Sequence, residues 1–248
     1  MSRIDDYREK LRVLKAWDSY LLNESNLPGP RANLELAFAV ANEGSEELFL
    51  KYVRIDPDGV DSNSQEVFLP ICGVIGLGYL AAHGGSKHFS LLRNCASDPR
   101  WRIREAVALG LQKYGETAFE ELLELLKIWS RGSLLERRAV VATLCEPALL
   151  RDRGKVIKVL GLLDEITASI QSETDRGSGE FRVLRKALGY GWSIVVAADL
   201  ETGKPRLEKW MKSKDKDIVW IMKNNLKKNR LIKMDPGWVE AQLSSLSS

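Results

Sequence analysis

The residues best suited to catalysis or metal binding in this chain are two histidines, three cysteines and several clustered carboxylates. His83 and His88 lie beside a glycine-bearing break, and neither has a nucleophile or an acidic residue at a recognisable catalytic spacing. The sequence contains no P-loop, no HExxH and no GxSxG motif. We therefore expect no catalytic residue, no metal site and no cofactor, and a protein that is not an enzyme.

The carboxylates and cysteines also fit structural roles. Glu120, Glu121 and Glu124 cluster as on the solvated face of a helix. Cys72, Cys95 and Cys145 are an odd number without CxxC spacing, which is typical of buried reduced thiols. The first fifteen residues are charged throughout and lack the apolar core of a signal peptide. These features together indicate a cytoplasmic protein.

Charge is distributed unevenly along the chain. Residues 204–233 contain eleven lysines and arginines against three acidic residues, a balance of +8, whereas the whole chain is only +3. Such a segment attracts polyanions, and nucleic acid is therefore a possible partner of this region. Trp210 and Trp220 are interleaved with these cations and suit either base stacking or a helical core. The alternative for the cations themselves is the polar cap that ends a repeat protein.

Helical spacing of apolar residues runs through the whole chain, with hardly any period-two alternation, so we expect an all-α protein. Residues 3–22 are predicted to form a first amphipathic helix. Residues 67–82 carry no charge but fall short of the roughly twenty apolar residues that span a bilayer. We predict a buried helix there, with glycines that admit close neighbours, and no membrane association.

A repeat of about 34 residues organises these helices. Small or apolar anchor positions recur at separations of 35, 34, 33, 48 and 34 residues. The anchors are Ala37, Cys72, Ala106, Ala139, Ala187 and Ile221. A further helix is predicted before each of the later five, over 45–54, 86–95, 118–129, 153–170 and 206–212. The long interval coincides with the polar run 171–180, which predicts an extended, mobile loop. Helical hairpins of this size bury their apolar faces by stacking, which predicts a solenoid.

The clearest copy of the repeat, SDPRWRIREAVALGLQKYG at 97–115, resembles the second helix of HEAT repeats. The resemblance implies a right-handed superhelix of about six helical hairpins in a single domain, with a capping helix at 1–25, repeats over 26–233 and a tail at 234–248. It also implies a ladder of hydrogen bonds in which Asp98 and Arg104 take part. Arg137 and Arg185 occupy the position in their repeats that Arg104 occupies in its own. Six residues earlier, however, Arg131 and Gly179 stand where the ladder needs an acidic residue.

HEAT repeats imply a non-catalytic binding or scaffold module that recognises a protein partner through a groove lined by the second helices. Arginines that lack their ladder partners are candidates for that groove, together with neighbouring lysines. The candidate contact residues are Arg102, Arg104, Arg137, Arg138, Arg185, Lys186, Lys223, Lys227 and Lys228.

The alternative is a DNA- or RNA-binding protein distantly similar to the HEAT-like DNA alkylation repair glycosylases. Their catalytic pocket relies on an aspartate flanked by tryptophan. The nearest match here, Trp17 followed by Asp18, lies outside the repeats, so no catalytic residue carries over.

Overall fold

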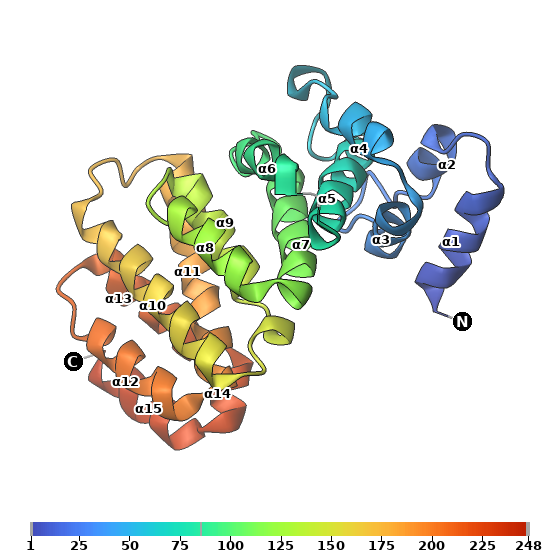
Figure 1. The fold of residues 1–248 in the computed structure, drawn as a ribbon. Helices are drawn as coiled ribbons and strands as arrows, with labels where there is room; N and C mark the ends of the chain where they lie inside the picture. Colours follow the sequence, from blue (N-terminus) through green and yellow to red (C-terminus); the bar gives the residue numbers. More distant parts are fainter. Residues whose placement is uncertain (1, 85, 247–248) are drawn as a thin grey trace. The chain divides into compact units, whose positions relative to one another are not determined.

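The computed structural model describes residues 2–84 and 86–246, and within those residues it is 77% helix with no strand. This confirms the all-α prediction. The chain divides into two compact units, residues 1–122 and residues 123–248, with the boundary inside α8 (Phe119–Trp129). Figure 1 shows the helices of both units.

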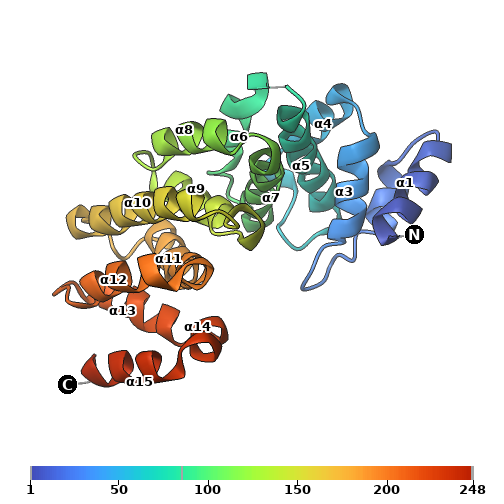
Figure 2. The same ribbon diagram turned by 60° about the horizontal axis from the view of Figure 1, so that its bottom comes forward.

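The first unit contains a row of three packed helices. The row consists of α3 (Leu34–Glu43), α5 (Phe68–Ala82) and α7 (Trp101–Thr117), in which α5 contacts both of the others. The remaining helices of this unit are α1 (Arg3–Val13), α2 (Asp18–Asn23), α4 (Glu46–Val53) and α6 (Phe89–Cys95), with short 3-10 turns at Pro57–Gly59, Gln65–Val67 and Ser86–His88. α1 packs on α3, α4 packs on α5, and α6 packs on α7. Figure 2 shows α3, α5 and α7 following one another within this unit.

α5 forms the core of the first unit, and glycines allow its neighbours to come close. A Cβ atom on Gly78 would lie 2.4 Å from the Cα of Gly110 in α7, and one on Gly76 would lie 2.4 Å from the Phe49 ring in α4. The window Gln65–Ala82 is long and apolar enough to cross a membrane, yet 72% of it is buried inside the protein, as in the core helix of a soluble protein. The prediction of a buried helix with close neighbours is confirmed.

The second unit also contains a row of packed helices. α11 (Gly179–Ala198) contacts both α9 (Leu134–Leu144) and α13 (Lys216–Leu226). α10 (Arg153–Ser169) and α12 (Leu200–Met211) pack on each other, and each contacts α11. α14 (Asn229–Met234) and α15 (Pro236–Ser245) complete the unit, with 3-10 turns at Pro147–Leu149 and Ile170–Ser172.

The predicted anchors lie in six different helices, one in each of α3, α5, α7, α9, α11 and α13. Five of them are buried, and Ala187 is partly exposed. The clearest copy of the repeat begins later than expected, because α7 starts at Trp101 and continues through Gly115 to Thr117. The repeat therefore identifies the helices of both rows.

Several element predictions differ from the structure. The helix expected over 3–22 is interrupted between Val13 and Asp18, where the Trp17 indole nitrogen donates to the Leu11 carbonyl at the end of α1. The segment 234–248, expected as a tail, contains α15, which begins at an Asp235 N-cap and Pro236. Val239 of α15 is buried, so this helix packs into the unit.

The loop expected at 171–180 is short and tethered. It is confined between the 3-10 turn Ile170–Ser172 and the start of α11 at Gly179. Arg176 lies within it and pairs with both Asp215 and Asp217. The prediction of an extended loop is wrong, because much of the long repeat interval is taken up by the 17 residues of α10, the 3-10 turns on either side of it and the part of α11 that precedes Ala187.

Candidate functional site

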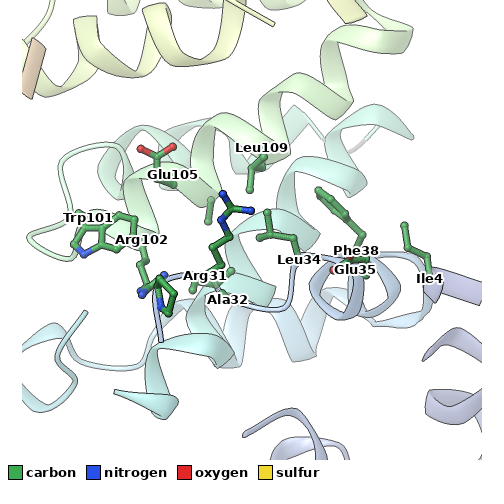
Figure 3. Close-up of a pocket in the computed structure, with 13 residues that line it drawn as sticks. Ile4, Arg31, Ala32, Leu34, Glu35, Phe38, Trp101, Arg102, Glu105 and Leu109 are labelled. Atoms are coloured by element: carbon green, nitrogen blue, oxygen red, sulfur yellow. The ribbon is translucent and has the colours of Figure 1, made fainter. Parts of the chain in front are cut away.

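A pocket of about 640 Å³ opens on the row of helices in the first unit. α3, α5 and α7 all contribute to its lining, together with Ile4 of α1 and the segment 30–32. Figure 3 shows the lining residues running from Trp101 and Arg102 at one end to Phe38 and Ile4 at the other. The helices that carry the first three anchors therefore also shape the pocket.

The lining combines apolar side chains with a few charges. Phe38, Ile71 and Leu109 are partly exposed or buried apolar residues, while Leu34 and Trp101 are 37% and 41% exposed. Large apolar side chains exposed in a concavity are typical of binding sites. This arrangement suits an apolar group of a ligand.

Arg31 is the lining cation that is free to meet a ligand. It is exposed and has no ion pair or side-chain hydrogen bond in the part of the chain that the structure describes. In Figure 3 its side chain extends across the pocket toward α7, with Leu34 beside it and Glu105 opposite. An acidic group bound here would meet an unpaired guanidinium.

Arg102, a predicted contact residue, forms a wall of this pocket. Its Nε donates to the Ser62 carbonyl at 2.7 Å, and its Nη2 donates to the Gly29 carbonyl at 2.6 Å. The guanidinium also stacks on the Trp101 ring at 4.3 Å from the centroid. Burial lowers the pKa of Arg102, which is only 6% exposed. Arg102 thus ties α7 to two loops and holds Trp101 in place.

Comparisons with protein-family models, curated proteins and solved structures found no match to this chain.

Arg104 and Arg137 both bind carbonyl oxygens near the start of their own helices. Arg104 Nη1 donates to the carbonyls of Asp98 and Pro99, while the Asp98 carboxylate pairs with Arg100. Arg137 Nε donates to the Gly132 carbonyl, and its Nη1 contacts Ser169 Oγ at 3.2 Å and Glu173 at 3.8 Å. Arg138 beside it is buried in α9. These arginines serve the packing of their own unit.

The expectation that Arg137 and Arg185 lack acidic partners is wrong. Arg185 pairs with Asp217 in the first turn of α13 and stacks on Trp220 at 4.4 Å from the ring centroid. Glu173 follows the 3-10 turn between α10 and α11, and Asp217 lies in α13, so each acidic partner comes after its arginine in the chain and not six positions before it. These two arginines are not the free groove cations that the sequence suggested.

The predicted lysines differ from the arginines in being unpaired. Lys186, Lys223 and Lys227 have no ion pair or side-chain hydrogen bond among residues 2–84 and 86–246. Lys228 lies over the Tyr190 ring, 5.2 Å from its centroid. These four lysines come from α11, α13 and the start of α14, on a different unit from the pocket.

The side chains considered for catalysis have structural surroundings. All three cysteines are free and buried, and burial raises the pKa of each thiol, to about 12 at Cys95. Asp18, which follows Trp17, accepts hydrogen bonds from Lys51 at 2.7 Å and the Tyr52 hydroxyl at 2.5 Å. No group of three histidine, cysteine or acidic side chains in the described residues could hold a metal ion.

Sequence reasoning missed Arg31, Leu34 and Phe38 as site residues. Leu34 and Phe38 are four residues apart and therefore lie on one face of α3. The spacing of apolar residues assigned this helix to the core. Leu36, Ala37 and the neighbouring small residues already fill that core. The sequence did contain a signal for this site: α3 carries apolar residues on a second face, in addition to those that fill the core.

Proposed function

We propose that this protein is a non-catalytic helical binding module that recognises a partner protein through the pocket on α3, α5 and α7. The observation that carries the proposal is the exposure of Leu34 and Trp101 in a pocket of about 640 Å³ lined by all three helices. A HEAT-like stack of hairpins, in which the second helices line the inner surface, accounts for the position of this pocket on one row.

The lining defines the chemistry of the partner segment. An apolar side chain of the partner fills the space between Leu34 and Leu109, and an acidic group beside it pairs with Arg31. Buried aromatic and apolar anchors carry most of the energy of such interfaces, and a flanking charge adds specificity. The partner segment we propose is an apolar residue with an aspartate or glutamate next to it.

The experiment starts by identifying the partner through site-specific photo-crosslinking. A photo-reactive amino acid at Leu109 is compared with one at Ile157, an exposed apolar residue of α10 in the other unit. We expect a discrete adduct from position 109 only. The captured protein is then purified and its affinity measured by calorimetry, because capture alone does not establish a pocket contact.

Leu34→Glu supplies the decisive measurement, with Ile157→Glu as the matched control. Leu34 is exposed, so the substitution leaves the fold intact and places a charge in the pocket. We expect Leu34→Glu to weaken binding at least tenfold, as at an interface hot spot, and Ile157→Glu to leave it unchanged. Equal effects of the two substitutions, or none from Leu34→Glu, would refute the proposal.

A further inference from the structure

The second unit has a cationic face built from two packed helices. A Cβ atom on Gly189 of α11 would lie 3.0 Å from the Trp220 ring and 3.5 Å from the Asn224 Cβ in α13, so the two helices meet at this point. Lys186 and Tyr190 flank Gly189 along α11, and Lys223 and Lys227 flank Asn224 along α13. We call Lys186, Tyr190, Lys223, Lys227, Lys228 and Arg230 the α11–α13 face.

The α11–α13 face lacks acidic residues of its own. There is none from Phe181 to Ala198 and none from Ile218 to Met234, the stretches that supply every residue of this face. Three of the acidic residues just outside are already engaged: Asp217 and Asp215 hold Arg185 and Arg176, and Asp235 pairs with Lys204. Glu180 lies in the first turn of α11, six residues before Lys186. The lysine charges on this face are therefore not neutralised within it.

An aromatic ring lies among these cations. Tyr190 is 47% exposed, and its ring is contacted by Lys228 and by Arg230, whose Cζ lies 4.5 Å from the ring centroid. Arg230 also donates to the Tyr190 hydroxyl. Trp220, by contrast, is covered by Arg185 on one side and lies against Gly189. Tyr190 is thus the more exposed ring of this face, and a base that stacks on it shares the ring with Lys228 and Arg230.

We propose that the α11–α13 face binds single-stranded nucleic acid. The five cations contact successive phosphates, and Tyr190 stacks on a base. Exposed cations combined with an accessible aromatic ring are the usual means by which proteins bind single strands without sequence preference. An acidic peptide would use the cations but has no base to stack, so the ring favours nucleic acid. This function is independent of the pocket on the first unit.

The test measures, by fluorescence anisotropy, the binding of fluorescein-labelled oligouridylate and oligodeoxythymidylate of about 16 nucleotides. Five phosphate contacts to a single strand predict a slope of about −3.5 for log affinity against log salt, or about 100-fold weaker binding between about 50 and 200 mM salt. A duplex of the same length, polyglutamate and vesicles containing phosphatidylserine serve as competitors. We expect each to compete less well than unlabelled single strand.

A double substitution with a matched control locates the site. Lys223→Gln with Lys227→Gln removes two cations of the face, and Lys10→Gln with Lys15→Gln removes two exposed lysines of the first unit. We expect the first pair to reduce the salt slope by about 1.4 and the second to leave it unchanged. Tyr190→Phe keeps the ring and should bind normally, whereas Tyr190→Ala should bind about tenfold more weakly.

Three results would overturn the proposal. The first is no binding of either oligonucleotide at low salt. The second is an equal loss from both pairs of lysine substitutions. The third is stronger competition by polyglutamate or by anionic vesicles than by single strand, which would assign the face to an acidic protein or to a membrane surface instead.

Discussion

Gly78 and Gly110 bring the backbones of α5 and α7 into direct contact. A methyl group on Gly78 would lie 2.4 Å from Gly110 Cα, whereas one on Gly110 would lie 3.2 Å from Gly78 Cα. We expect Gly78→Ala to lower the free energy of unfolding by about 3 kcal/mol, because backbone atoms rather than a flexible side chain must move. Gly110→Ala should cost clearly less. Urea unfolding followed by circular dichroism measures both.

Gly161 provides the control for this comparison. It lies inside α10 and has no neighbouring atom within 4 Å of an added Cβ. Gly161→Ala should therefore stabilise the protein by about 0.5–1 kcal/mol through helix propensity. If Gly78→Ala proved as harmless as Gly161→Ala, the close approach of α5 and α7 would be incorrect.

Asp215 makes the stability of the second unit depend on pH. Its pKa lies below the ordinary value, chiefly because its carboxylate accepts hydrogen bonds from Arg176. A lowered pKa adds stability above the ordinary value near 4, and this stability is lost as the pH falls through the folded-state pKa. Asparagine at this position keeps the N-cap oxygen that α13 requires but loses the charge.

Asp215→Asn should accordingly lower the free energy of unfolding by about 1 kcal/mol near pH 7, and by little near pH 3. Urea unfolding at the two pH values measures the difference. The same loss at both pH values would show that the charge-dependent pairing with Arg176 is not what the substitution removes.

For Arg137 and Arg185, the sequence predicted the positions of the arginines within their helices but not the acidic residues with which they pair. Arg137 and Arg185 lie in helices, α9 and α11, as the motif predicts, and their acidic partners Glu173 and Asp217 are 36 and 32 residues further along the chain. A motif that specifies only positions within one helix contains no information on a pairing made with a residue more than thirty positions away. The packing of the helices decides that pairing.

Among the elements, α7 is fastened to two loops through Arg102. The two hydrogen bonds that Arg102 donates to the Gly29 and Ser62 carbonyls need a forked guanidinium, and lysine cannot reproduce that geometry. We expect Arg102→Lys to speed amide hydrogen exchange in residues 26–32 and 56–64 by severalfold, with α7 itself little changed. Mass spectrometry of the exchanged protein provides the measurement.

Arg131 serves as the control for Arg102. It is exposed and has no ion pair in the described part of the chain. Arg131→Lys should leave exchange unchanged throughout. Unchanged exchange in both loops of Arg102→Lys would mean that other contacts hold them.

Local start signals mark some element boundaries. α15 begins at an Asp235 N-cap followed by Pro236, although residues 234–248 were expected as a tail because apolar spacing alone did not suggest a helix there. The break between α1 and α2 had no such signal, because Val13 to Trp17 contain neither glycine nor proline. The Trp17 indole nitrogen donates to the Leu11 carbonyl at the end of α1, a side-chain bond that helical spacing of apolar residues does not predict.

For the whole molecule, the charge separates between the two units. Residues 1–122 contain 14 basic and 18 acidic residues, and residues 123–248 contain 23 basic and 16 acidic residues. We expect the protein to bind both cation- and anion-exchange resins near pH 7 at low salt, despite its small net charge. The substitutions Lys223→Gln and Lys227→Gln should lower the salt needed for elution from the cation exchanger. Retention on neither resin would contradict this expectation.

The burial of Cys72, Cys95 and Cys145 has a practical consequence for studying both surfaces. Thiolates are the reactive form of cysteine, and burial with a raised pKa keeps these thiols protonated and inaccessible near pH 7. A cysteine introduced at exposed Leu34 or Lys227 would then be the one thiol open to maleimide labelling. A fluorophore or spin label can therefore be attached at one chosen site without first replacing any of the native cysteines.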